Sequence, residues 1–154
     1  MTQESRRGRV TILVCDDDED DRALIGQALG QTHHEINVQF LEDGEQLLDY
    51  LLLRGKYAGD AANAPRPGLI LLDLNMPRMN GTEALKAIKE NETLRHIPVV
   101  MLTTSGREED ILGSYQLGAN AFIRKPVTYT GLVEAMGVVG RYWLEIVKLS
   151  TTTA

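Results

Sequence analysis

The chain has 154 residues, of which 43% are apolar and 25% are charged, and its formal net charge at neutral pH is −6. This length suits one globular domain, and an acidic surface argues against non-specific binding to nucleic acids or anionic membranes. No segment approaches the roughly 18–20 consecutive apolar residues of a membrane span, and the single cysteine, Cys15, excludes an internal disulfide. We therefore expect a cytoplasmic protein with one domain over residues 9–149, a flexible N-terminal tail (1–8) and a C-terminal tail (150–154).

Apolar runs alternate with amphipathic stretches along the chain. The runs are rich in Val, Ile and Leu, which is typical of buried strands, and the stretches between them repeat apolar residues at helical spacing. Five strands that alternate with five helices predict an α/β domain with a parallel sheet covered on both faces. In chain order, the pattern predicts a strand at 10–15, a helix from 20 to about 30, a strand at 36–41, a helix at 45–53, a loop at 55–68, a strand at 69–73, a helix at 82–90, a strand at 99–102, a helix at 108–117, a strand at 121–123 and a long helix from 128 to about 149.

Four of the predicted strands end in residues that carry chemistry. In a parallel sheet the carboxyl ends of all strands lie at one edge, which is where α/β proteins bind ligands. Each feature alone has a simpler interpretation, such as a solvent-exposed acidic run or a turn, but their arrival at one edge favours a functional site. The features are the acidic run 16–21 after the first strand, Asp73 at the end of the third, Thr103 after the fourth and Lys125 after the fifth.

The chemistry of these groups points to phosphoryl transfer. Converging carboxylates repel each other unless a cation lies between them, and Mg²⁺ prefers carboxylate, phosphate and water oxygens. Lys125 would offer a positive charge to a phosphoryl oxygen, and Thr103 would offer a hydroxyl donor. A carboxylate, a metal, a lysine and a hydroxyl are the groups that transfer of a phosphoryl group onto an aspartate, here Asp73, requires.

The motifs at these strand ends resemble those of the receiver domain of bacterial two-component response regulators. The similarity extends from Val10 to about Val147, and the long loop after the second helix and the segment 142–149 resemble the single-domain receivers that serve bacterial phytochrome histidine kinases. The resemblance implies a flavodoxin-like, doubly wound sheet with strand order 2-1-3-4-5, five helices and an extended last helix. The motifs that carry it are ILVCDD (12–17), LILLDLNMP (69–77), MNG (79–81), VVMLTT (99–104) and AFIRKP (121–126).

The resemblance also implies a role for each residue of the metal site. Asp73 would be the phosphoacceptor and, with Asp16, Asp17 and the main-chain carbonyl of Asn75, would hold Mg²⁺. Asp17 would bind the metal directly, and Asp16 would act partly through water. Because six acids follow the first strand, the acidic pair could instead be Asp17 and Asp18; we favour Asp16 and Asp17, which come first after the apolar run.

The remaining implied roles concern the response to phosphorylation. Thr103 would be the switch hydroxyl that bonds the phosphoryl group. Phe122 occupies the switch aromatic position, where many family members have Tyr, so the ring is kept and the hydroxyl is lost. Lys125 would pair with a phosphoryl oxygen, and we expect its peptide bond to Pro126 to be cis.

These roles predict a response regulator that accepts a phosphoryl group from a cognate histidine kinase, for which a bacterial phytochrome kinase is the implied partner. The face formed by the fourth predicted helix (108–117), the fifth strand (121–123) and the last helix (128 to about 149) would then change and signal by protein contact. We expect a downstream phosphotransfer protein as a further partner and no role for nucleic acid or membrane. The protein would catalyse only its own phosphorylation and dephosphorylation, and Asn75 and Ser105, which flank the site, would tune the lifetime of the phosphate. One alternative is a haloacid-dehalogenase-type phosphatase, which needs a second aspartate where this chain has Asn75; another is an interaction module independent of phosphate.

The last predicted helix carries a wide apolar stripe at helical spacing. The stripe could pack on the protein's own sheet, but residues 132–136 of the same helix are already suited to that contact. We therefore predict that the stripe forms the surface of a homodimer, since two-fold homodimers are the commonest oligomers. Its residues are Val139, Tyr142, Trp143, Ile146 and Val147.

Overall fold

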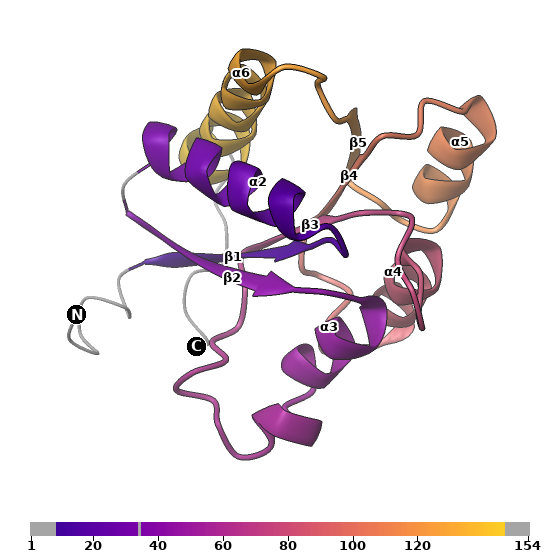
Figure 1. Cartoon of the computed structure of the whole chain (residues 1–154). Helices are drawn as coiled ribbons and strands as arrows, with labels where there is room; N and C mark the ends of the chain where they lie inside the picture. The colour runs from indigo at the N-terminus through magenta and orange to yellow at the C-terminus, as the bar shows by residue number, and fades with distance from the viewer. Residues whose placement is uncertain (1–8, 34, 147–154) are drawn as a thin grey trace.

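A five-stranded parallel sheet lies at the centre of the computed structural model, which describes residues 9–33 and 35–146 (Figure 1). The strand order is β2-β1-β3-β4-β5 and every neighbouring pair runs parallel, which confirms the predicted fold class and topology. The predicted tails at 1–8 and 150–154 lie outside the described residues. The strands are β1 (Val10–Cys15), β2 (Ile36–Leu41), β3 (Leu69–Leu72), β4 (Val99–Thr103) and β5 (Ala121–Arg124).

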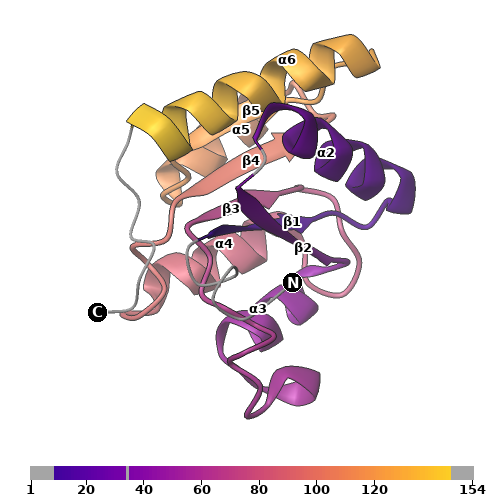
Figure 2. The same cartoon turned by 90° about the vertical axis from the view of Figure 1, so that its left-hand side faces the viewer.

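Helices cover both faces of this sheet. Figures 1 and 2 show α2 and α6 side by side on one face and α3 and α4 on the other, while α5 lies beside the β5 edge. Within the described ranges, every helix falls short of the length and apolar content that crossing a bilayer requires. The helices are α2 (Glu19–Thr32), α3 (Gly44–Leu51), α4 (Gly81–Glu90), α5 (Glu108–Gln116) and α6 (Tyr129–Gly140), with a short 3₁₀ turn η1 (Gly55–Tyr57) and a π-helical segment η2 (Arg141–Ile146).

The alternation of side chains along each strand divides the core into two layers. In β1, Ile12 and Val14 face α2 and α6, whereas Leu13 and Cys15 face α3 and α4, as the two-residue period of a strand requires. All four residues of β3 are buried because helices cover both of its faces, which is usual for parallel sheets. The central strands are thereby fixed, and their carboxyl ends are held at one edge.

Most helices begin at a side-chain cap. The side chains of Asp18, Asp43 and Thr128 accept hydrogen bonds from the first turns of α2, α3 and α6, and Asn80 forms a capping box with Glu83 at the start of α4. Each such cap stabilises a helix by about 1 kcal/mol. Helix α5 has no side-chain cap, so it is the helix whose start is least firmly fixed.

The end of the chain corrects the prediction of one unbroken helix over 128–149. The α-helix α6 ends at Gly140, and the chain continues as π-helical η2 up to Ile146, while 147–149 lie outside the described residues. The change occurs where the ring of His33 packs directly on the backbone of Gly140. Two glycines in the last turn of α6, Gly137 and Gly140, also weaken the regular helix there, since glycine disfavours a helix interior by about 1 kcal/mol relative to alanine.

Candidate functional site

The carboxyl ends of β1, β3, β4 and β5 bring the predicted site residues to one edge of the sheet. Cys15 at the end of β1 lies opposite Leu72 at the end of β3, and the backbone N–H of Asp73 donates to the Cys15 carbonyl at 3.0 Å. On the other side, the backbone N–H of Lys125 donates to the carbonyl of Thr103 at 2.7 Å. The sheet register therefore places Asp73 beside the acidic run and Lys125 beside the end of β4.

Three carboxylates gather at this edge. Asp16, Asp17 and Asp73 each offer a carboxylate oxygen, and these oxygens lie within 4.8 Å of one another. Asp16 and Asp73 are buried, whereas Asp17 is exposed. Oxygen ligands at this spacing fit a hard divalent cation, and the mutual repulsion of the carboxylates would favour its binding.

Asp18 has a different task from the two acids before it. Its side chain accepts a hydrogen bond from the backbone N–H of Asp21 at 3.0 Å and caps α2. The carboxylate cluster contains Asp16 and Asp17 and not Asp18, whose carboxylate is occupied by this cap. The geometry thus favours Asp16 and Asp17 as the acidic pair.

Lys125 pairs with two carboxylates of this cluster and with a further one from the first turn of α2. Its Nζ lies 2.5 Å from Asp16 Oδ2, 2.9 Å from Asp21 Oδ2 and 3.7 Å from Asp73 Oδ2. Asp21 was not among the predicted site residues. Its position three residues after the cap Asp18, on the first turn of α2, is the signal that could have placed it near the sheet edge.

Burial and pairing set the protonation of this group. Burial alone would lower the pKa of Lys125, but hydrogen bonds to Asp16 and Asp21 outweigh it, so the pKa of the lysine is raised above its ordinary value. Burial raises the pKa of Asp16, and the hydrogen bond from Lys125 partly offsets that rise. Lys125 therefore stays cationic at neutral pH and remains available to an anionic oxygen.

The loop between β3 and α4 is clamped by close backbone approaches. A Cβ added at Gly81 would overlap the carbonyl oxygen of Asp73, and the Gly81 N–H donates to the Leu74 carbonyl at 2.9 Å. Arg78 in this loop has a φ of 65°, a strained conformation for a non-glycine residue. Asn75 is exposed in the same loop, two residues after Asp73. Gly81 was not among the predicted site residues, although it belongs to the MNG motif (79–81).

The residues predicted to respond to phosphorylation lie along β4 and β5. Thr103 is fully buried at the end of β4, and its Oγ1 accepts a hydrogen bond from the backbone N–H of Ser105 at 3.4 Å. Phe122 is half-buried in β5 and packs against the core layer beneath α3 and α4. Two residues of α5 that were not among the predicted site residues, Asp110 and Tyr115, accept hydrogen bonds here. The Ser105 hydroxyl donates to Asp110 Oδ2 at 2.6 Å, and the Phe122 N–H donates to the Tyr115 hydroxyl at 3.1 Å.

The prediction of a cis bond between Lys125 and Pro126 is wrong for this structure. No peptide bond within the described ranges is cis, so this bond is trans. The trans form is the default for a bond to proline, favoured by about 0.5–1 kcal/mol.

The predicted dimer stripe is corrected in part. Val139 and Trp143 are buried, with 2% and 9% of their surface exposed, and belong to the core layer between the sheet and α2 and α6. They pack on the protein's own sheet because α6 and η2 present them inward, and so they are not available to a second copy. Tyr142 is 50% exposed. The side chain of Ile146 and all of Val147 lie outside the part that the structure describes.

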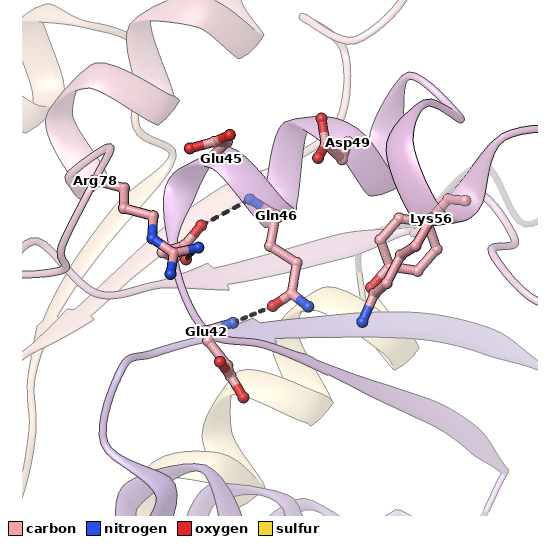
Figure 3. Close-up of a pocket in the computed structure, with 8 residues that line it drawn as sticks. Glu42, Glu45, Gln46, Asp49, Lys56 and Arg78 are labelled. Atoms are coloured by element: carbon pink, nitrogen blue, oxygen red, sulfur yellow. Dashed lines mark hydrogen bonds and ion pairs between the residues drawn. The ribbon is translucent and has the colours of Figure 1, made fainter.

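A separate polar pocket of about 260 Å³ lies at the start of α3 (Figure 3). Arg78 points to the start of this helix and pairs with Asp43 at 3.5 Å. Gln46 donates its backbone N–H to Asp43 Oδ1 at 2.8 Å and accepts the backbone N–H of Glu42 at 2.7 Å. These contacts cap α3. The ion pair of Arg78 with Asp43 also ties the loop between β3 and α4, which carries Asn75, to the start of α3.

The chain is similar to known proteins over nearly its whole length. Residues 12–137 match the sequence family described as the response regulator receiver domain. The response regulator Rcp1 of Synechocystis sp. is 38% identical over 149 residues, which are 97% of this chain and 98% of Rcp1.

Two solved structures superpose closely on this chain. The phosphorylated cyanobacterial phytochrome response regulator RcpA has a TM-score of 0.84 at 38% identity, over 92% of this chain and 98% of RcpA. The Mn²⁺-bound form of Rcp1 has a TM-score of 0.82 at 37% identity, over 92% of this chain and 99% of Rcp1.

Proposed function

The chain belongs to the family of response regulator receiver domains, and on that premise we propose that Asp73 accepts a phosphoryl group from a phosphohistidine of a histidine kinase. The observation that carries this proposal is the cluster of Asp16, Asp17 and Asp73, in which the ammonium of Lys125 pairs with Asp16 and Asp73. A carboxylate oxygen of Asp73 would form the new O–P bond as the N–P bond to the kinase histidine breaks. The leaving imidazole would take up a proton. Two-component signalling is the process in which such a receiver works.

The site residues divide the work of this transfer between them. Asp16, Asp17, Asp73 and the main-chain carbonyl of Asn75 would hold Mg²⁺, which supplies positive charge to the transferring group when it is bound. Lys125 would donate to a phosphoryl oxygen, since it is already cationic at this edge. Catalysis would then rest on positioning and electrostatic stabilisation. Support for a divalent metal comes from the donor set and from the Mn²⁺-bound form of the relative Rcp1.

The kinase would approach over the first two turns of α2 and the loop between β5 and α6. A pocket of about 130 Å³ lies there and includes both Asp21 and Lys125 in its lining. Leu24 and Val127 beside it are 39% and 102% exposed. Exposed apolar side chains next to a charged site are what an apolar helix face of a partner protein would cover.

The proposal is tested with a small-molecule phosphodonor. Wild-type protein incubated with acetyl phosphate and Mg²⁺ should gain one acid-labile phosphoryl group, measured by intact-protein mass spectrometry or phosphate-affinity gel. Asp73→Asn should gain none, because its amide cannot form the mixed anhydride. Asp20→Asn is the matched control, since Asp20 is exposed in the same acidic run and lies outside the cluster. Labelling of Asp73→Asn at the wild-type level would contradict the assignment of the phosphoacceptor.

A bacterial phytochrome histidine kinase is the partner that we propose. The support is similarity over nearly the whole chain to Rcp1 and to the phytochrome response regulator RcpA. Phosphotransfer from candidate kinases to Asp73, compared at equal kinase phosphorylation, would identify the partner by its rate. A downstream phosphotransfer protein would be recognised by loss of label from Asp73, and Asn75 and Ser105 would set how long the label persists in its absence.

Two further properties belong to this proposal. The protein would turn over no external substrate, because Asn75 stands where a phosphatase of the haloacid dehalogenase type needs an acid, and it would act in the cytoplasm. A homodimer would use exposed side chains of α6 and η2, of which Val138 and Tyr142 are 67% and 50% exposed. Light scattering on the protein with and without phosphodonor would give its mass, and a monomer in both conditions would contradict the dimer.

A further inference from the structure

Helix α5 buries few side chains and makes side-chain hydrogen bonds at both of its ends. Among its nine residues, all of which the structure describes, Ser114 alone is buried. Leu112 and Tyr115 are 57% and 47% exposed. Segments with so little apolar burial unfold locally at a low free-energy cost. The polar contacts at the two ends of α5 therefore matter for its position.

The first contact joins the start of α5 to the loop after β4. The Ser105 hydroxyl donates to Asp110 Oδ2 at 2.6 Å, and the Ser105 N–H donates to Thr103 Oγ1 at 3.4 Å. A hydroxyl has only one proton to donate. While Asp110 accepts that proton, Ser105 cannot donate to a phosphoryl oxygen on Asp73.

The second contact joins the end of α5 to β5. Because β5 is an edge strand, the N–H of Phe122 on its open side has no neighbouring strand to accept it. The Tyr115 hydroxyl accepts it instead, at 3.1 Å. Tyr115 thereby holds the backbone of the residue at the switch aromatic position, which itself has no hydroxyl.

We propose that these two hydrogen bonds, Ser105 to Asp110 and Phe122 to Tyr115, form a tether that holds α5 and that a phosphoryl group on Asp73 releases. The inference rests on the proposed function of Asp73. A phosphoryl oxygen would compete with Asp110 for the Ser105 proton, and a movement of Thr103 and Phe122 would draw the Phe122 N–H away from Tyr115. Asp110 and Tyr115 are thus positioning residues that oppose the change, and by linkage they lower the affinity of the site for a phosphoryl group.

The test uses beryllofluoride with Mg²⁺ as the probe for a phosphoryl group on Asp73. In Asp110→Ala and Tyr115→Phe one hydrogen bond of the tether is missing, so the affinity for beryllofluoride should rise about two- to tenfold. A variant that had merely lost structure would bind more weakly. Asp110→Asn keeps an acceptor for Ser105 and should bind like the wild type.

Matched controls separate the tether from general effects of these substitutions. Glu109→Ala removes a carboxylate from the same turn of α5, where Glu109 pairs with Arg107 and not with Ser105. Tyr57→Phe removes a hydroxyl from a tyrosine that packs beneath α3. Both should bind beryllofluoride with wild-type affinity.

Amide hydrogen exchange at Phe122, measured by NMR, provides a second readout. In the wild type this amide should exchange slowly and become faster when beryllofluoride binds, whereas in Tyr115→Phe it should exchange fast in both conditions. Normal binding by the wild type with no gain in either variant would overturn the tether alone. Failure of the wild type to bind beryllofluoride would overturn the proposed function, and the tether with it.

Discussion

At the scale of single residues, Gly81 decides how closely α4 approaches the phosphoacceptor. Its N–H donates to the carbonyl of Leu74, and its Cα lies directly over the backbone of Asp73 and Leu74. A side chain at this position would meet backbone atoms, which cannot swing aside as a flexible side chain can. Glycine is therefore needed here for close approach and not for a left-handed conformation.

We expect Gly81→Ala to destabilise the protein by about 1–3 kcal/mol, because the added Cβ forces α4 away from the Asp73 backbone. Urea unfolding measures the loss, and a Mg²⁺ titration of the folded variant should show weaker binding, since the loop of Asn75 moves as well. Gly30→Ala is the matched control. Gly30 has open space around its Cα in α2, so alanine there should stabilise by about 0.5–1 kcal/mol. Equal stabilities for the two variants would contradict the role of Gly81.

The residues that could be predicted are those that follow a strand directly. Asp16, Asp73 and Lys125 were placed from the sequence because parallel strands bring their carboxyl ends to one edge. Asp21 and Tyr115 were not, since the ion pair of Asp21 with Lys125 spans 104 positions of the chain and the contact of Tyr115 depends on how α5 lies against β5. Contacts of this kind depend on where a helix packs on the sheet, which the local sequence pattern does not determine.

At the scale of elements, the packing of α2 on α6 explains where the last helix changes. His33 lies at the end of α2, and its ring fills the space above Gly140 at the end of α6. Its Nε2 is buried without a hydrogen-bond partner among the described residues, so the ring contributes by packing alone. The strands and helices could be predicted to within a few residues, but the end of α6 could not, because a contact with α2 determines it.

We expect Gly140→Ala to destabilise the protein, because its Cβ would overlap the His33 ring. In a His33→Ala background the same change should become neutral or stabilise by up to about 1 kcal/mol, since the space is free and alanine favours a helix. Urea unfolding of the two single variants and the double variant gives the coupling free energy. Gly137→Ala, whose Cβ would lie 3.5 Å from Thr32 Cγ2, should be harmless in both backgrounds. Additive effects of His33→Ala and Gly140→Ala would exclude direct packing between them.

At the scale of the whole molecule, folding concentrates negative charge at one edge of the sheet. The site holds the carboxylates of Asp16, Asp17, Asp21 and Asp73 against the single ammonium of Lys125. In the unfolded chain these groups separate and lose any shared metal. A cation that binds only the folded protein must therefore stabilise it, and the gain depends on the ratio of its concentration to its dissociation constant.

We expect Mg²⁺ at about one hundred times its dissociation constant to raise the free energy of unfolding by about 2.7 kcal/mol. Asp17→Asn should remove most of this gain. Asp17 is exposed, so the substitution should cost little stability in the presence of EDTA, which separates loss of a ligand from loss of structure. Asp20→Asn, in the same acidic run but outside the cluster, should keep the full gain. Urea unfolding with Mg²⁺ and with EDTA measures all three proteins, and equal responses of Asp17→Asn and Asp20→Asn would exclude Asp17 as a ligand and leave only general screening of an acidic surface.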